Sequence, residues 1–307
     1  MDANVDTSNG GEARWIGLPY DVNTAASLTF IASFGLGTII HLIQMCWLKT
    51  WFFIPFLIGC IMETFGYYGR YWLSQEPENF KAYVLYDLLV LPAPIFLAAT
   101  MYMSISRIIL ALDAAELSPV RPKWFSKMFV MGDVICFLVQ IAGTGMTVTI
   151  SEKMQKIGQI VVVVGLVFQI LVFVCFIWLV VVFYRRCGRQ DGAKDVGLKW
   201  RRYVLALLAA SGCIVLRNLV IGIQHAQGAD GFVASHEVFA YLFEAVPIFA
   251  VVCIFAVYQP GRLQKSVRGL KMGSSESDSI PMVQSEEPTL PIMDLHESGR
   301  RYEAYRP

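Results

Sequence analysis

Seven stretches of the chain are long enough and apolar enough to cross a membrane, and more polar segments separate them. A helix needs about 20 apolar residues to cross a bilayer, whereas a membrane-spanning strand takes about 10 residues of alternating polarity. The stretches have the greater length and do not alternate. We therefore predict an all-α integral membrane protein, a seven-transmembrane-helix bundle. The predicted helices cover residues 23–46, 51–72, 82–107, 128–148, 159–184, 203–225 and 236–258.

Lysine and arginine residues are divided unequally between the two sets of predicted loops. Sixteen lie on one side, in the loops near Lys49, Arg121 and Arg186 and after Arg262, against five on the other side. Loops that carry an excess of positive charge stay in the cytoplasm. The bias predicts an N-terminus outside the cell and a C-terminus in the cytoplasm.

The pattern divides the chain into three parts. We expect an extracellular N-terminal segment over residues 1–22, a seven-helix membrane domain over 23–262 and a cytoplasmic tail over 263–307. The first segment is acidic and lacks the basic start and apolar core of a cleaved signal peptide. The tail is rich in Ser, Glu and Pro without an apolar period, so we expect it to be disordered.

Composition supports the membrane assignment and argues against several function classes. The chain is 56% hydrophobic and 16% charged, whereas soluble domains are nearer half and a quarter. A formal net charge of +1 gives no reason to expect a nucleic-acid partner. The cysteines form no CxxC pair and the histidines are scattered, so we predict no metal site. Neither a P-loop nor a GxSxG motif occurs. We therefore expect no cofactor and no enzymatic activity.

One predicted helix carries both an acid and a base in an otherwise apolar run. Glu63, Tyr67 and Arg70 are spaced i, i+4 and i+7, so they share one helix face. Ionisable groups inside a membrane are expensive to keep, which makes them candidates for a functional site.

Counting inward from the loops places further polar residues at a similar depth, in the outer half of the bundle. We predict that eight residues contribute to a substrate-binding layer: Glu63, Tyr67, Arg70, Asp87, Arg217, Glu237, Tyr241 and Glu244. Asp133 lies nearer the cytoplasm, with Gln140 seven residues on. A structural alternative is that Glu63 and Arg217 only pair with each other. The layer contains four acids against two arginines, so mutual pairing would not neutralise it. We favour a polar cavity that opens outward and accepts a cationic ligand.

Prolines interrupt two of the predicted helices. Pro92 and Pro94 lie in the third helix, and Pro247 lies three residues after Glu244 in the seventh. Proline frees backbone carbonyls and bends the axis, which is tolerated where protein or water satisfies them. Small residues such as Gly66 and Gly69 permit close helix approach.

Taken together, these residues resemble the fungal RTA-like family, the lipid-translocating exporters linked to aminocholesterol resistance and sphingoid-base release. The resemblance covers about residues 18 to 262 and depends on their order along seven helices. The matching positions are Pro19, Asn23, Glu63, Gly66-Tyr67, Arg70, Leu91-Pro92-Ala93-Pro94, Ala98-Ala99, Tyr102, Arg107, Asp133, Gln140, Gly143, Gly165-Leu166, Gln169, Arg217, Glu237, Tyr241, Glu244, Pro247 and Pro260-Gly261.

The chain departs from the family pattern at three places. In the predicted helix 203–225 the family pattern has a second arginine and a glutamate, where this chain has Ile221 and Gln224. Glu244 stands where aspartate is usual, and Gln259 replaces a histidine. These changes bear on the substrate more than on the fold.

The resemblance implies a function. We expect a multi-pass transporter, resident in the plasma membrane, that moves amphiphilic lipids or lipid-like toxicants across or between leaflets. Sphingoid bases, sterol-like amines and porphyrins are the implied substrates, and membrane lipids are the implied partners. The alternative is a seven-helix lipid-sensing receptor without net transport, although the predicted helix 236–258 has neither an Asn-Pro-x-x-Tyr motif nor a lysine for retinal.

Overall fold

The computed structural model describes residues 5–6, 14–15, 18, 20–147, 151–189, 200–227 and 231–267. In this part of the chain seven helical segments are long and apolar enough to span a membrane, which confirms the predicted seven-helix fold. They run Thr24–Leu48, Trp51–Gln75, Phe80–Ala111, Ser126–Gly143, Lys153–Arg189, Trp200–Gln227 and Glu237–Val267. The orientation of the termini stays a prediction.

The segments divide into shorter elements. The helices are α1 (Thr24–Leu48), α2 (Ile54–Gln75), α3 (Phe80–Val90), α4 (Ala93–Ala111), α5 (Pro122–Thr147), α6 (Glu152–Arg189), α7 (Trp200–Gln227), α8 (Glu237–Phe239) and α9 (Val246–Val257), with short turns η1 (Trp51–Phe53), η2 (Ala115–Leu117) and η4 (Ala240–Ala245). Residues 260–267 form a further short helix. The only strands among the described residues are β1 (Val5–Asp6) and β2 (Arg14–Trp15), which pair antiparallel.

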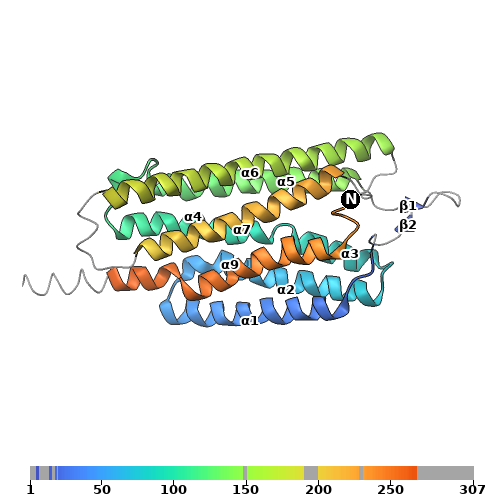
Figure 1. Cartoon of the computed structure of the whole chain (residues 1–307), viewed down its shortest axis with the longest axis horizontal. Coiled ribbons are helices and arrows are strands. Elements are labelled where there is room, and N and C mark those ends of the chain that lie inside the picture. Colours follow the sequence, from blue (N-terminus) through green and yellow to red (C-terminus); the bar gives the residue numbers. More distant parts are fainter. Residues whose placement is uncertain are drawn as a thin grey trace, which may run out of the picture. The chain divides into compact units, whose positions relative to one another are not determined.

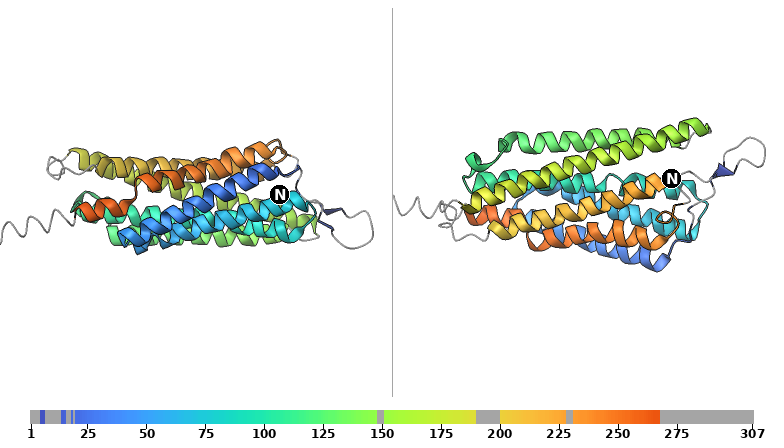
Figure 2. Two further views of the ribbon diagram at one scale, coloured as in Figure 1. Left: turned by 90° about the horizontal axis from the view of Figure 1, so that it is seen from below. Right: turned by 45° about the horizontal axis from the view of Figure 1, so that its top comes forward.

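The long helices lie side by side along one direction (Figure 1). α2 packs on α1, α3 and α4, and α5 lies between α4 and α6. The bundle closes because α9 packs against both α1 and α7. The two views of Figure 2 show the same arrangement, with α5 and α6 adjacent along their length.

Two of the seven predicted helices are interrupted within their length. The third segment is interrupted at Leu91 and Pro92, where α3 ends and α4 begins. Pro94 has no N–H to donate to the carbonyl of Val90, four residues earlier, so the α-helical ladder is broken there. The seventh segment changes from α8 through the π-helical turn η4 to α9.

Aromatic packing fills the part of the bundle between α1, α2 and α9. The rings of Phe53, Phe56 and Phe255 are fully buried and lie 5.0 to 5.9 Å apart between centroids. His41 belongs to this core, and its Nε2 lies 3.0 Å from the carbonyl oxygen of Val252. A hydrogen bond to a neighbouring backbone gives this histidine a structural role.

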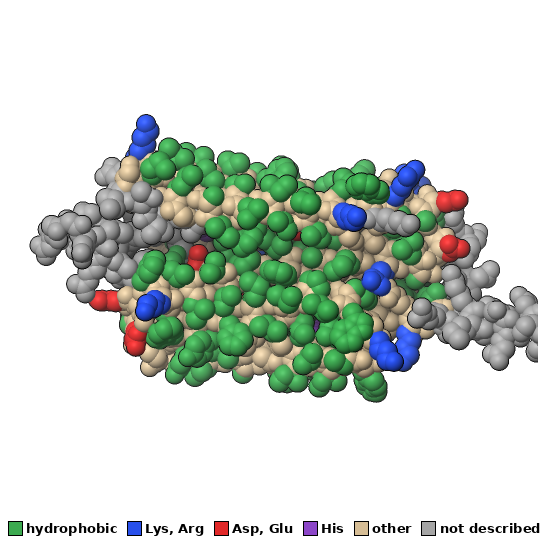
Figure 3. Space-filling view, turned by 180° about the vertical axis from the view of Figure 1, so that it is seen from behind, with side chains coloured by type: hydrophobic (Ala, Val, Ile, Leu, Met, Phe, Trp, Pro, Cys, Tyr) green, Lys and Arg blue, Asp and Glu red, His purple; other side chains and the backbone are tan. Residues whose placement is uncertain are grey.

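The outward faces of the helices are strongly apolar. Figure 3 shows hydrophobic side chains over the middle of one face, with charged side chains gathered toward its two ends. Ile39, Leu171 and Trp178 are 56%, 59% and 59% exposed. An apolar band between polar ends is what a bilayer requires.

Several predictions fall wholly or partly outside the described residues. The tail from residue 268 onward and most of the segment 1–22 are among them. The proposed boundaries at 22 and 262 therefore stay predictions, although the helix that begins at Pro260 continues to Val267.

Candidate functional site

The polar residues of α2 form one buried stripe. Glu63, Tyr67 and Arg70 are 1%, 1% and 0% exposed and face the same side of the helix. Gly69 allows α3 to approach this face, because a Cβ there would lie 2.8 Å from the backbone nitrogen of Tyr86. The close approach brings Tyr86 against the stripe.

Arg70 is enclosed by residues from several parts of the chain. Its Nε donates to the Tyr241 hydroxyl at 3.1 Å, and its Nη2 donates to the Tyr20 hydroxyl at 3.2 Å. The same Nη2 forms an ion pair with Glu237 at 3.4 Å. The guanidinium carbon lies 4.7 Å from the ring centroid of Tyr241 and 5.2 Å from that of Tyr86. An acid and ring faces thus stabilise a buried cation.

Glu237 also holds the start of α1. Its Oε1 accepts a hydrogen bond from the backbone N–H of Asn23 at 2.7 Å. Asn23 is in turn the N-cap of α1, since its side chain accepts from the N–H of Ala26 at 3.1 Å. The ion pair of Arg70 is therefore tied to the entry of the first helix.

Arg217 of α7 makes a second ion pair deeper in the bundle. Its Nη2 lies 3.2 Å from Oε1 of Glu244 and donates to the carbonyl oxygen of Val90 at 3.0 Å. Tyr86 donates its hydroxyl proton to the other oxygen of Glu244 at 2.8 Å. Val90 is the residue whose helical partner is removed by Pro94. Because Pro94 cannot bond to this carbonyl, the oxygen of Val90 is left to accept the hydrogen bond from Arg217.

Glu63 differs from the other acids of the site. Both of its carboxylate oxygens are buried and have no hydrogen-bond partner. The structural alternative, in which Glu63 and Arg217 pair, is wrong: Arg217 pairs with Glu244 instead. Arg217 and Glu244 are nevertheless the charged groups that act on Glu63 electrostatically. A buried acid without a partner is costly unless another group meets it.

Tyr241 and Glu244 both lie in the π-helical turn η4. The N–H of Val246 bonds to the carbonyl of Tyr241, five residues earlier. The wider turn comes directly before Pro247, whose ring would clash with the preceding turn of a regular helix. Such π-turns are frequent at functional sites.

We use the name polar layer for the residues that these contacts connect, together with the carboxyl group of Glu63. Its members are Glu63, Arg70, Tyr86, Arg217, Glu237, Tyr241 and Glu244. The layer contains three acids and two arginines, so formally one acid exceeds the bases. Glu237 and Glu244 keep 18% and 17% of their side chains exposed, whereas Glu63 and Arg70 are buried. The partly exposed acids of the layer therefore both belong to the seventh segment.

Two of the predicted site residues stand apart from these bonds. Tyr67 belongs to an aromatic wall, with its ring 5.3 Å from Phe30 and 5.6 Å from Phe34. Asp87 is half-buried on α3, and neither arginine of the layer bonds to it.

Sequence reasoning missed several contributors. Tyr20 and Tyr86 both contact Arg70, and Ser27 lies 3.1 Å from the Tyr241 hydroxyl. Asn218 is 1% exposed, and its Nδ2 has no partner. Tyr86 is adjacent in sequence to Asp87, and Asn218 is adjacent to Arg217. Both could have been predicted as polar neighbours of residues already assigned to the site.

A second buried polar group lies elsewhere in the bundle. Tyr102 donates to Asp133 at 2.7 Å, and Gln140 donates to Gln169 at 3.0 Å. These bonds join α4, α5 and α6, and none reaches the polar layer. Asp133 is thus separate, as its predicted depth indicated. Among the described residues no three His, Cys, Asp or Glu side chains are grouped to hold a metal ion.

Comparison with known proteins tests the resemblance. The sequence profile described as RTA1 like protein matches residues 56–266. The chain belongs to the RTA1-like family. The predicted resemblance is therefore confirmed, and the match includes every predicted site residue.

The RTA1-like chain is similar to several fungal proteins. It is 36% identical over 209 residues to protoporphyrin uptake protein 1 of Saccharomyces cerevisiae, covering 67% of each chain. It is 26% identical over 257 residues to the probable lipid transporter atnI of Emericella nidulans, covering 80% of this chain and 67% of that protein. A sphingoid long-chain base transporter of S. cerevisiae, RSB1, is 26% identical over 159 residues, covering 51% of this chain and 42% of its own length. No solved structure matches the chain significantly.

Proposed function

We propose that this chain transports amphiphilic lipids or lipid-like toxicants, with a cationic headgroup, across or between the leaflets of the plasma membrane. The proposal assigns it no chemical conversion of the lipid. The names of the relatives support transport of lipids or lipid-like molecules in general. The preference for a cation comes from the polar layer.

The partnerless carboxyl group of Glu63 carries this proposal. Arg70 and Arg217 are each paired with another acid. Arg70 Nη1 and Arg217 Nε also lack hydrogen-bond partners, but neither nitrogen bonds to Glu63. An ammonium headgroup would supply both the missing hydrogen-bond donors and the missing positive charge. The ring of Tyr67, on the same face of α2 as Glu63, suits a cation, whereas the ring of Tyr241 already lies against Arg70 and Phe30. The sphingoid bases carry such a headgroup on a long apolar chain.

Porphyrins are the second substrate class, because one relative is named for protoporphyrin uptake. A porphyrin carries carboxylates and so requires a positive partner. Each arginine would first have to leave its glutamate, Glu237 or Glu244. A cationic substrate needs no such rearrangement, and we therefore rank it first.

The test is transport of a labelled sphingoid base in vesicles that contain the purified full-length chain. Glu63→Gln keeps the shape of the side chain and removes its charge. We expect this variant to reduce the initial flux at least tenfold, because one lost charge contact is worth about 1.5–3 kcal/mol.

Asp133→Asn is the matched control, since it also neutralises a buried acid but lies outside the polar layer. It should leave flux within about twofold of the unmodified protein. Equal flux for the protein and Glu63→Gln would contradict the role of Glu63. Specific binding of the base without any flux would favour a lipid sensor over a transporter.

A further inference from the structure

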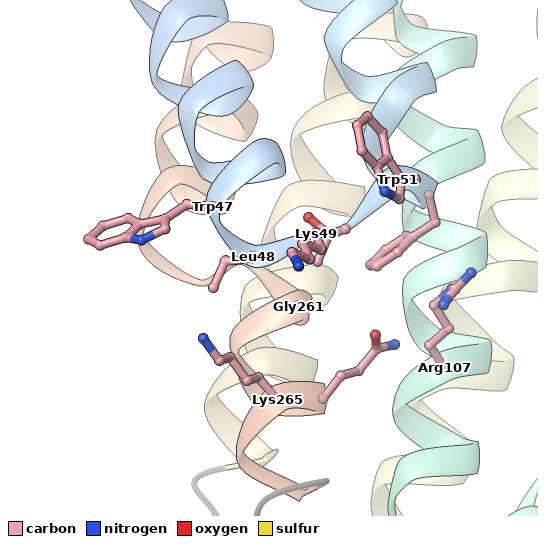
Figure 4. Close-up of a pocket in the computed structure, with 10 residues that line it drawn as sticks. Trp47, Leu48, Lys49, Trp51, Arg107, Gly261 and Lys265 are labelled. Atoms are coloured by element: carbon pink, nitrogen blue, oxygen red, sulfur yellow. The ribbon is translucent and has the colours of Figure 1, made fainter.

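A second site candidate lies at the other end of α1, away from the polar layer. A cavity of about 710 Å³ opens there between the turn after α1, the last turns of α4 and the helix 260–267. Its lining includes the three cations Lys49, Arg107 and Lys265 (Figure 4). α1 has 25 residues, so at 1.5 Å per residue its two ends are about 37 Å apart. This basic pocket lies at the Lys49 end of α1 and shares no described lining residue with the polar layer, so the two sites are separate.

Among the residues that the structure describes, no acid forms an ion pair with the three cations of the basic pocket. Each side chain is exposed, and none belongs to an ion pair between described residues. The described residues of the lining include no aspartate or glutamate. Figure 4 shows Arg107 and Lys265 on opposite sides of the pocket, with Lys49 at the turn above them. Like charges gathered around one pocket repel each other, so the arrangement favours an anion between them.

The local backbone holds Lys49 in an uncommon conformation. Lys49 ends α1 with φ 54° and ψ 41°, a left-handed conformation in which glycine is usual. A residue with a side chain is strained at such a position, because its Cβ lies too close to the following carbonyl oxygen. The turn is retained because the N–H of Thr50 bonds to the carbonyl of Met45 at 3.0 Å. Strained backbone positions cluster at functional sites, which makes Lys49 a candidate ligand-binding residue.

Gly261 lines the pocket where the helix 260–267 packs against the turn after α1. A Cβ on Gly261 would lie 2.2 Å from Cγ2 of Thr50, so a side chain here would force Thr50 or the helix 260–267 to move. Gln259 also donates to Thr50 Oγ1 at 3.3 Å. These contacts bring Lys265 and Lys49 to the same pocket. The pocket is thus built by packing between distant segments.

Aromatic residues place the pocket at the depth of lipid headgroups. Trp47 and Trp51 are 81% and 62% exposed at its rim, and exposed tryptophans concentrate at the membrane–water interface. The guanidinium carbon of Arg107 lies 4.2 Å from the ring centroid of Phe52, which orients the group. Arginine is well suited to phosphate recognition because its donors form a planar fork.

We propose that the basic pocket binds the phosphate headgroup of an anionic glycerophospholipid from the adjoining leaflet. The leaflet that the charge bias assigns to this end is the cytoplasmic one, where anionic lipids concentrate. The bound lipid holds the turn after α1, α4 and the helix 260–267 together. This site is independent of the proposed transport function.

The test titrates the purified full-length chain, in phosphatidylcholine-containing micelles, with dioctanoyl phosphatidylserine and follows the thermal unfolding midpoint. We expect phosphatidylserine to raise the midpoint in a saturable way, because a ligand that binds only the folded state stabilises it. Dioctanoyl phosphatidylcholine and inorganic phosphate at the same concentrations should not raise it. An equal rise with inorganic phosphate would overturn the assignment to a lipid and indicate a free-anion site.

A triple variant removes the cations of the basic pocket. It combines Lys49→Gln, Arg107→Gln and Lys265→Gln, and it should lose the response to phosphatidylserine. The single changes Lys49→Gln and Lys265→Gln should each weaken the apparent affinity roughly fivefold, since a cation near an anionic lipid contributes about 1 kcal/mol. The two single variants also decide the question if the triple variant does not fold.

A second triple variant with the same change in net charge is the control for general surface charge. It combines Arg121→Gln, Lys127→Gln and Arg202→Gln, which replace three exposed cations that do not line the pocket. This control should keep the response to phosphatidylserine within about twofold. Equal responses in the two triple variants would overturn the proposal, and so would an unchanged affinity in both single variants.

Discussion

Arg70 and Arg217 are both buried and paired, but their surroundings differ. Arg70 has tyrosine hydroxyls and ring faces in addition to Glu237, whereas Arg217 depends on Glu244 and one backbone carbonyl. Removing one partner of a buried pair leaves an uncompensated charge, which costs more than the pair itself contributes. The acids of the polar layer should therefore differ in their effect on stability.

Glu244→Gln should lower the free energy of unfolding by about 3 kcal/mol, because it leaves the buried guanidinium of Arg217 without its acid. Glu63→Gln removes no hydrogen bond and should change it by less than about 1 kcal/mol. Thermal unfolding of both variants in the same detergent measures the difference. A larger loss for Glu63→Gln would show that Glu63 has a structural partner.

Arg70→Lys tests the aromatic enclosure at constant charge. Lysine keeps the ion pair with Glu237 within reach, but it lacks the planar fork that bonds Tyr20 and Tyr241 together. We expect a loss of about 1–2 kcal/mol in the free energy of unfolding. Unchanged thermal stability would mean that the charge alone holds this part of the layer.

At the scale of elements, the site depends on close packing between α2 and α3. Gly69 is the point of contact, and the backbone of Tyr86 leaves no room for a Cβ. The position of Tyr86, and with it the contacts to Arg70 and Glu244, follows from this approach.

Gly69→Ala should therefore destabilise the bundle by about 1–3 kcal/mol through overpacking. Gly222→Ala on α7 is the matched control, because a Cβ there meets nothing within 4 Å; it should be neutral or slightly stabilising, since alanine favours helix. Thermal unfolding compares them. Equal stability of the two variants would contradict the close contact.

The sequence predicted part of this arrangement, and the reason is helical periodicity. The spacing of Glu63, Tyr67 and Arg70 placed them on one face because α2 is a regular helix. The pairing of Arg217 with Glu244 was not predictable in this way. It depends on the π-turn η4 and on the carbonyl of Val90, which Pro94 leaves without a helical donor. Helical periodicity of 3.6 residues predicts neither feature.

At the scale of the whole bundle, the number of helices followed from the sequence because the bilayer fixes the length of an apolar span. The sequence did not predict which helices lie next to each other. Contacts such as those of α9 with α1 and α7 depend on side-chain packing between segments far apart in the chain.

The orientation of the bundle is a separate prediction from the loop charges. An epitope tag at the N-terminus should bind antibody on intact cells, and a tag at the C-terminus should bind only after permeabilisation. Fluorescence microscopy of the two tagged forms measures this. The reverse labelling pattern would contradict the orientation and would place the basic pocket in the outer leaflet.

The most direct measurement of the central claim compares two substrates in vesicles that contain either the unmodified chain or Glu63→Gln. One substrate is a labelled sphingoid base, and the other is its N-acetyl derivative, which has the same chain but no ammonium charge. If the headgroup charge meets Glu63, the unmodified chain should move the free base at least tenfold faster than the derivative, and the ratio should fall to near one in the variant. A ratio that is the same in both proteins would contradict the account.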